Sequence, residues 1–185
     1  MKNLPRPGAD CERLVAVLGS SSSKEGDPSY ETAVDLGHEI VRRGGSVLCG
    51  GYGGIMEAAC RGARDAGGEA VGVILAGGGE PNLWVTQRVV AEDLAERLRR
   101  LRDLARAWIF MPRGLGTLLE LVWVAESIVK GEALPRPVVL FGPFWKPLVE
   151  TVLSEATGAR REDLLRCLRW ASDPQEAARL ALPDS

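Results

Sequence analysis

Short, continuously apolar runs alternate with helical patterns along this chain, and this alternation constrains its fold more than any other feature. The runs lie at 14–18, 46–49, 70–75, 107–110 and 137–141, with weaker ones at 85–90 and 168–171. Strands that are apolar at every position are buried on both faces, as they are in a parallel sheet covered by helices. The pattern therefore predicts an α/β fold: a doubly wound, Rossmann-like, mainly parallel sheet with helices on both faces.

The segments between these runs carry helix signals. Asp27-Pro28 begins the first helix, because proline suits the first helical position, and Gly44-Gly45 ends it. The other predicted helices run from 55 to near 67 and over 94–105, 118–129, 147–157 and 174–182. No repeat or linker divides the 185 residues, so we expect one Rossmann-like nucleotide-binding domain, 1–185, with residues 1–12 as a loose N-terminal tail.

The overall composition narrows the classes of function. A net charge of −2 gives no global field that would favour nucleic acid or a membrane surface, and no apolar run reaches the roughly 20 residues that span a bilayer. The start of the chain lacks the apolar core of a signal peptide, and the 4 cysteines lack the paired spacing of a zinc site. We therefore expect a cytoplasmic protein with free thiols, no metal, and no nucleic-acid or membrane partner.

The stretch 106–130 contains the clearest signal for a site. An apolar run ends at the loop 112–117, Pro-Arg-Gly-Leu-Gly-Thr, and a helical pattern starts directly afterwards. A tight glycine loop before a helix leaves backbone N–H groups free where the helix dipole is positive, and such a place suits a phosphate. In this interpretation the two glycines let the backbone approach the phosphate, and Thr117 donates its hydroxyl proton. The competing interpretation is a capping box, in which the Thr117 and Glu120 side chains satisfy those N–H groups instead.

Two further glycine-rich loops, 19–23 and 50–54, follow strands that should end at the same edge of the sheet. Glycine is unfavourable in such numbers unless a positive φ or a close approach of the backbone is needed. No Gly-Lys-Ser/Thr follows to make a Walker loop, and the spacing does not match a dinucleotide fingerprint with its acid. We therefore expect the three loops to form one site for a phosphate.

Two other polar residues need an interpretation. Arg97 belongs to an arginine-rich helix face, which is normally solvated, but its place just before the glycine-loop strand favours a functional role. His38, the only histidine, lies inside the first predicted helix, where a surface residue is far commoner than a general base. A Ser-His-Asp or Cys-His site would have to use His38, so we set both aside.

These residues together resemble the LONELY GUY (LOG) family, the cytokinin riboside 5′-monophosphate phosphoribohydrolases that were long misnamed lysine decarboxylases. The family hallmark, Pro-Gly-Gly-x-Gly-Thr-x-x-Glu, is matched by 112–120 except at Arg113. A second and looser match is Gly-Gly-Tyr-Gly-Gly-Ile-Met-Glu at 50–57, and the family's upstream arginine falls on Arg97. The resemblance spans roughly 14–141.

The resemblance implies a hydrolase that cleaves the N-glycosidic bond of a purine or cytokinin-type nucleoside 5′-monophosphate, releasing the base and ribose 5-phosphate. It implies that Glu120 stabilises the ribosyl cation or activates water and that Arg97 orients the substrate, without a metal or other cofactor. It also implies a homodimer, for which the nearly all-apolar helix 118–129 fits the interface. With the loops, it gives these expected nucleotide-binding residues: Gly19, Ser20, Gly51, Gly53, Gly54, Met56, Arg113, Gly114, Leu115, Gly116 and Thr117.

Two departures from the family pattern leave an alternative open. Arg113 stands where the family has glycine, so it either blocks the loop or adds a cation beside the phosphate. Leu98 stands where the family has lysine. The alternative is therefore a non-catalytic nucleotide-binding sensor or carrier on the same fold. Amino-acid decarboxylation has no support, because no lysine lies at a loop suited to a pyridoxal Schiff base.

Overall fold

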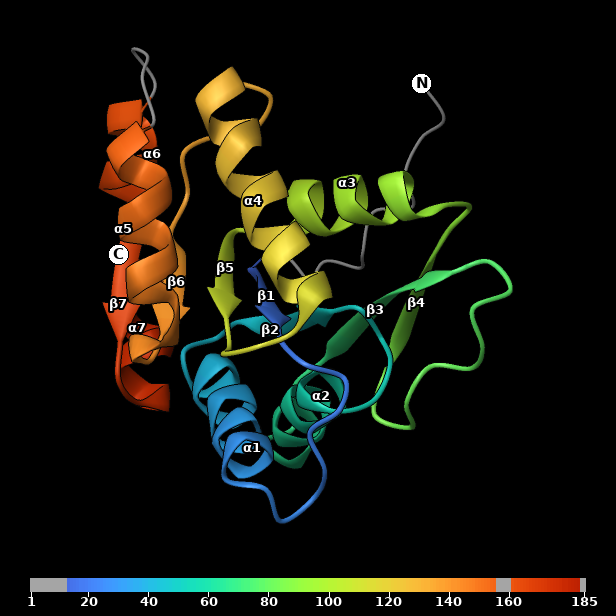
Figure 1. Cartoon of the computed structure of the whole chain (residues 1–185). Helices are drawn as coiled ribbons and strands as arrows, with labels where there is room; N and C mark the ends of the chain where they lie inside the picture. The colour runs from blue at the N-terminus through green and yellow to red at the C-terminus, as the bar shows by residue number, and fades with distance from the viewer. Residues whose placement is uncertain (1–12, 156–160, 184–185) are drawn as a thin grey trace.

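The computed structural model describes residues 13–155 and 161–183, in which strands and helices alternate along the chain (Figure 1). The predicted tail 1–12, Cys11 and the last residues of the predicted helix 147–157 lie outside the described residues. None of the described helices combines the length and the apolarity needed to cross a membrane.

The described strands form one seven-stranded sheet in which every neighbouring pair is parallel. The strands are β1 (Leu14–Leu18), β2 (Ser46–Cys49), β3 (Ala70–Leu75), β4 (Gln87–Ala91), β5 (Ala107–Phe110), β6 (Val138–Phe141) and β7 (Leu168–Ala171). Their order is β4-β3-β2-β1-β5-β6-β7, so the predicted fold class is confirmed. The strand order reverses between β1 and β5, and the crevice at their carboxyl ends is the usual place for a ligand in such sheets.

Helices cover both faces of this sheet (Figure 1). On one face lie α1 (Pro28–Arg42), α2 (Ile55–Asp65) and α7 (Pro174–Ala181). On the other face lie α3 (Leu94–Leu104), α4 (Leu115–Lys130), α5 (Lys146–Glu155) and α6 (Arg161–Cys167), with the short 3-10 helix η2 (Pro143–Trp145) directly before α5. The helices that the glycine loops precede therefore lie on opposite faces, α2 on one and α4 on the other.

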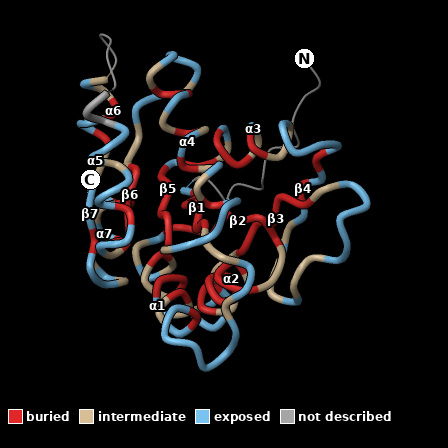
Figure 2. The backbone as a smooth tube through the Cα atoms, in the orientation of Figure 1, coloured by how far each residue is buried: buried red, intermediate tan, exposed pale blue. Residues whose placement is uncertain are grey.

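Burial on both faces of β1 explains its continuously apolar sequence (Figure 2). Val15 and Val17 pack into the core beneath α1 and α2, whereas Leu14, Ala16 and Leu18 pack into the core on the α3 and α4 side. Successive side chains of a strand point to opposite faces, so a central strand of a covered sheet has no position for a polar residue.

One helix was missed by the sequence analysis and one strand is displaced from its predicted position. The missed helix is α6, in which only Leu164 and Cys167 are buried among largely charged residues, so it carries no clear apolar period. The displaced strand is β4, which begins at Gln87 rather than at 85. Val85 instead belongs to a turn, where its N–H donates to the Asn82 carbonyl at 3.3 Å.

The start of α4 decides between the two interpretations of the hallmark loop. The helix begins at Leu115, three residues before the predicted start, and Gly114 is its N-cap residue. Thr117 therefore lies inside the helix, and no side chain caps this end. The capping-box interpretation is wrong, because a cap requires the threonine at the position that Gly114 occupies.

Candidate functional site

The loops after β1 and β5 meet at the carboxyl edge of the sheet, beside the start of α4. Between them lies a pocket of about 170 Å³. Its lining comes from separate parts of the chain: Leu18, Gly19, Ser20, Ser21, Met56, Arg97, Gly114, Leu115, Gly116, Thr117 and Glu120. The structure therefore brings the first loop, the hallmark loop, Met56, Arg97 and Glu120 together at one place.

The amino-terminal end of α4 presents backbone N–H groups to this pocket. Gly114 has a φ of 100°, and the first helical hydrogen bond runs from the Leu118 N–H to the Gly114 carbonyl. The N–H groups of residues 115–117 consequently have no acceptor within the helix. The helix dipole adds partial positive charge at the same end, so this part of the pocket suits an anion.

Gly116 lies in the first turn of α4, where packing gives no reason for a glycine. A Cβ added there would meet no atom within 4 Å, and the residue lines the pocket. Glycine inside a helix is about 1 kcal/mol less favourable than alanine. The open space in front of this backbone is the room that a ligand needs to approach the N–H groups.

We expect the Gly116→Ala variant to be more stable than the wild-type protein and to bind AMP more weakly. The free energy of unfolding in urea should rise by about 0.5–1 kcal/mol because alanine favours the helix. The Kd for AMP, measured by calorimetry, should rise by about tenfold, which is ~1.4 kcal/mol, because the Cβ occupies space that the ligand needs. As a contrast, Gly62→Ala should lose stability, since its Cβ would lie 1.9 Å from the Val34 carbonyl oxygen. Unchanged AMP binding in Gly116→Ala would contradict a ligand at this position.

Arg97 enters the pocket from α3 and is fixed through several of its atoms. Its Nε donates to the Val73 carbonyl at 2.9 Å, and its Nη2 donates to the Gly50 carbonyl at 3.2 Å. The guanidinium carbon lies 5.8 Å from the centre of the Tyr52 ring, within range of a cation–π interaction. The Arg97 side chain is only 11 % exposed, whereas Arg99 on the same helix is exposed. The arginine-rich face of α3 is therefore not uniformly solvated.

Glu120 of α4 pairs with Arg97 across the pocket. The Nη1 of Arg97 lies 3.6 Å from Oε1 of Glu120, and both side chains are 11 % exposed. Burial raises the pKa of Glu120 from 4.5 to about 7, although the positive charge of Arg97 opposes part of that rise. A carboxyl group with a pKa near neutrality can stabilise positive charge or exchange a proton at physiological pH.

The second glycine loop supports the pocket from outside its lining. The residues Gly51, Gly53 and Gly54 are not part of the lining. Gly54 is the N-cap residue of α2 with a φ of 70°, and a Cβ there would lie 2.4 Å from the Ser20 carbonyl oxygen. That carbonyl accepts a hydrogen bond of 3.0 Å from the Ile55 N–H. The two loops are thus joined directly, and the second one holds Ser20 in place.

The two departures from the family pattern also lie outside the pocket lining. Arg113 directly precedes the lining residue Gly114, has an exposed side chain and has a φ of 73°, the only positive φ among the described residues other than glycine. Its backbone therefore adopts the conformation that the family's glycine would adopt readily. Leu98 is buried on α3, with 6 % of its surface exposed.

Three residues of the site were missed by the sequence analysis: Leu18, Ser21 and Gly50. Leu18 and Ser21 line the pocket, and a Cβ on Gly50 would lie 1.8 Å from Nη2 of Arg97, so only glycine lets that guanidinium reach the carbonyl. The loops 19–23 and 50–54 contain Ser21 and Gly50, but a run of glycines or serines does not show which member faces the ligand. Among the described residues, no group of three or more His, Cys, Asp or Glu side chains is arranged to hold a metal ion.

Comparison with protein families matches residues 56–181 to the family described as "Possible lysine decarboxylase". A cytokinin riboside 5′-monophosphate phosphoribohydrolase from Oryza sativa subsp. japonica is 32% identical over 182 residues, covering 89% of this chain and 70% of that protein. Another from Arabidopsis thaliana is 33% identical over 124 residues, covering 61% of this chain and 54% of that protein. Several of these alignments span only about half the length of the curated relative.

Solved structures share the fold over nearly the whole chain. The molybdenum cofactor binding protein from the phototrophic bacterium Rippkaea orientalis matches with a TM-score of 0.72 and 22% identity, covering 91% of this chain and 94% of that chain. At this level of identity the similarity shows a common architecture and carries no statement about the ligand.

Proposed function

The chain belongs to the LOG family, and we propose that it hydrolyses the N-glycosidic bond of a purine or cytokinin-type nucleoside 5′-monophosphate, giving the free base and ribose 5-phosphate. The observation that carries this proposal is the Arg97–Glu120 pair, 3.6 Å apart, beside the uncapped amino-terminal end of α4. The helix end suits a phosphate, and the buried carboxylate suits a ribosyl centre that gains positive charge. The names of the plant relatives support the same reaction.

In the proposed mechanism, the 5′-phosphate binds the N–H groups of residues 115–117, and its binding energy holds the sugar against Glu120. The C1′–N bond breaks with its electron pair going to the base, and the sugar acquires oxocarbenium character. The Glu120 carboxylate stabilises this charge and takes a proton from the water that forms the new C1′–O bond. That proton leaves with the base, so water is the only co-reactant. Arg97 keeps Glu120 oriented and ionised.

We expect kcat/KM for AMP hydrolysis to fall as the pH drops below about 7. Because burial raises the pKa of Glu120, the active carboxylate forms only as the pH rises through that value and is lost below it. A pH–rate profile should show this ionisation on its acidic limb. An acidic limb with its midpoint near 4.5, the ordinary pKa of a glutamate carboxyl, would contradict the role given to Glu120.

The reaction is tested by incubating the protein with AMP and isopentenyl-AMP and following the free base by chromatography. Equal amounts of base and ribose 5-phosphate would support the proposal. Adenosine is the matched control, and it should react far more slowly because it lacks the phosphate that supplies binding energy. If the protein at high concentration released no more free base than the blank, the proposed hydrolase function would be ruled out.

A non-catalytic nucleotide-binding sensor or carrier is the second candidate function. Arg113 favours it, because this exposed cation next to Gly114 can strengthen binding of a phosphate without adding any chemistry. The molybdenum cofactor binding protein shows that the fold also occurs in a protein named for binding a cofactor. Tight AMP binding in calorimetry, with no release of base, would favour this candidate over the hydrolase.

We also propose that two copies of the chain pair through α4. Leu119 and Val122 on this helix are 41% and 52% exposed. An entirely apolar groove of about 250 Å³ runs beside them between α4, α5 and α6. Contiguous exposed apolar surface is typical of an interface. Light scattering after size exclusion should give the mass of a dimer, and a monomer at micromolar concentration would rule out a stable pairing.

A further inference from the structure

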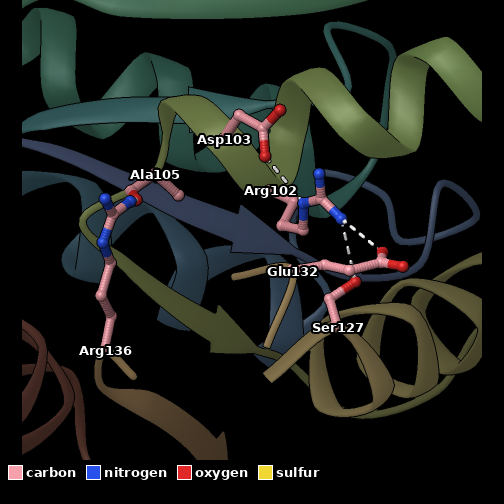
Figure 3. Close-up of polar contacts among 6 residues, drawn as sticks. All are labelled: Arg102, Asp103, Ala105, Ser127, Glu132 and Arg136. Carbon is pink, nitrogen blue, oxygen red and sulfur yellow. Dashed lines mark hydrogen bonds and ion pairs between the residues drawn. The ribbon is translucent and has the colours of Figure 1, made fainter. Parts of the chain in front are cut away.

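A buried arginine joins the two helices that carry Arg97 and Glu120. Arg102 lies on α3 and is 9 % exposed. Its Nη1 donates to the Ser127 hydroxyl of α4 at 3.1 Å and lies 3.3 Å from Oε2 of Glu132, just beyond the end of α4 (Figure 3). A single guanidinium thus connects α3 to the carboxyl-terminal end of α4.

The partners of Arg102 are themselves held in place. Ser127 is 4 % exposed, and its carbonyl accepts hydrogen bonds from the N–H groups of Glu132 and Ala133 at 2.8 and 3.0 Å. These bonds form because α4 ends at Gly131, whose left-handed conformation turns the chain back toward the helix. The backbone of the helix end therefore brings Glu132 close to Arg102.

A second arginine fixes the same end of α3 from the side of β6. Arg136 donates to the carbonyl of Ala105, the residue that caps the carboxyl-terminal end of α3 (Figure 3). The amino-terminal half of α3 is attached to the sheet through Arg97, which donates to the carbonyl of Val73 within β3 and to that of Gly50 directly after β2. Of these attachments, the one through Arg102 runs to α4, the helix that carries Glu120.

Ser127 and Glu120 lie on the same face of α4, because seven residues are close to two helical turns. The contact of Arg102 with Ser127 and the contact of Arg97 with Glu120 therefore lie along one stripe of this helix. The second contact is the looser one, at 3.6 Å, so a small shift of α3 relative to α4 would separate that pair first.

We propose that Arg102 is a positioning residue that holds α3 against α4, so that the Arg97 guanidinium stays beside the Glu120 carboxylate. The consequence for turnover rests on the proposed function, but the pairing itself can be measured without any substrate. Burial raises the pKa of Glu120 and the Arg97 guanidinium of α3 opposes that rise, while the charge of Glu120 acts on the Cys49 thiol at the end of β2. Arg97 is the positive charge that acts on Glu120, so at unchanged burial the pKa of Glu120 reports how close that guanidinium lies.

The test uses the Arg102→Leu variant, which keeps most of the buried volume and removes the polar contacts. The pKa of Glu120 is measured by carbon-13 NMR of the carboxyl group in the ligand-free protein, with Glu120→Gln to assign the signal. We expect Arg102→Leu to raise this pKa by about half a pH unit or more, because the opposing charge of Arg97 moves away. Arg102→Lys should restore part of the effect. Arg99→Leu, which removes an exposed arginine from the same helix, should leave the pKa unchanged.

Turnover is the second measurement, and kcat for base release should fall about tenfold or more in Arg102→Leu, since small misplacements of catalytic groups have large effects on rate. An unchanged pKa of Glu120 in a folded Arg102→Leu protein overturns the proposal. If that variant does not fold, Ser127→Ala removes one contact of Arg102, and an unchanged pKa there overturns it equally. A shifted pKa in a protein that releases no base would reject the proposed hydrolase and retain the positioning role.

Discussion

The Glu120→Gln variant should lose base release by about a thousandfold while binding AMP as tightly as the wild-type protein does. Glutamine has the size of glutamate, but it offers no negative charge to an oxocarbenium centre and no basic oxygen to water. The phosphate position at the start of α4 is untouched by the change. Single-turnover rates and calorimetric Kd values measure the two effects separately.

The same variant should be more stable than the wild-type protein above neutral pH. The folded state raises the pKa of Glu120 from 4.5 to about 7, so the unfolded chain ionises first and wild-type stability falls as the pH rises between these values. The shift corresponds to about 3 kcal/mol in the free energy of unfolding at pH 8, and the difference should vanish near pH 4. Urea denaturation at both pH values measures it.

Glu126→Gln is the matched control for these measurements. Glu126 lies on the same helix, is exposed, and pairs with Lys130 at 3.4 Å. Its substitution should change neither turnover nor the pH dependence of stability by more than a few tenths of a kcal/mol. Full activity in Glu120→Gln would show that the role given to this carboxylate is wrong.

The second large effect is expected from Arg97→Met, which should lower kcat/KM by about a hundredfold. Methionine keeps the unbranched apolar stem of the side chain, but the Val73 and Gly50 carbonyls lose their donor. Glu120 also loses its counter-charge, so its pKa should rise above 7 and the acidic limb of the pH–rate profile should move to higher pH.

The control for Arg97→Met is Arg99→Met, which removes one positive charge from the exposed side of α3. It should change neither kcat/KM nor the acidic limb of the pH–rate profile. Arg97→Lys should recover only part of the activity, because an ammonium group cannot reproduce the fixed fork that donates to two carbonyls and pairs with a carboxylate. If Arg97→Met kept the wild-type kcat/KM and the wild-type acidic limb of the pH–rate profile, Arg97 would have no part in the reaction.

Most of the sheet could be predicted because its strands are covered on both faces. The residues Leu14 to Leu18 are all buried, and only apolar side chains are stable there. The helix α6 could not be predicted in the same way, because just two of its residues reach the core. The charged residues of this helix pair with one another, as Arg166 does with Glu162 at 3.2 Å, and such pairs leave no apolar period in the sequence.

The hallmark loop and helix α4 could be predicted as part of the site because they are contiguous in sequence, and Gly19, Ser20, Met56 and Arg97 because motif positions mark them one by one. The first residue of α4 could not be predicted. Arg113 and Gly114 both adopt positive φ values, and an arginine in the sequence does not indicate a positive φ. The contact of Gly50 with Arg97 joins residues 47 positions apart, so it exists only in the fold. The same holds for Arg102, which resembles its exposed neighbours in sequence.

The proposed reaction requires a 5′-phosphate docked at the start of α4 with the N-glycosidic bond beside position 120. A crystal structure of the Glu120→Gln variant with AMP bound would show whether the nucleotide lies there. We predict phosphate oxygens within hydrogen-bonding distance of the N–H groups of residues 115–117 and C1′ of the ribose next to the side chain at position 120. AMP bound at another edge of the sheet, or with its phosphate turned away from α4, would contradict the proposed reaction.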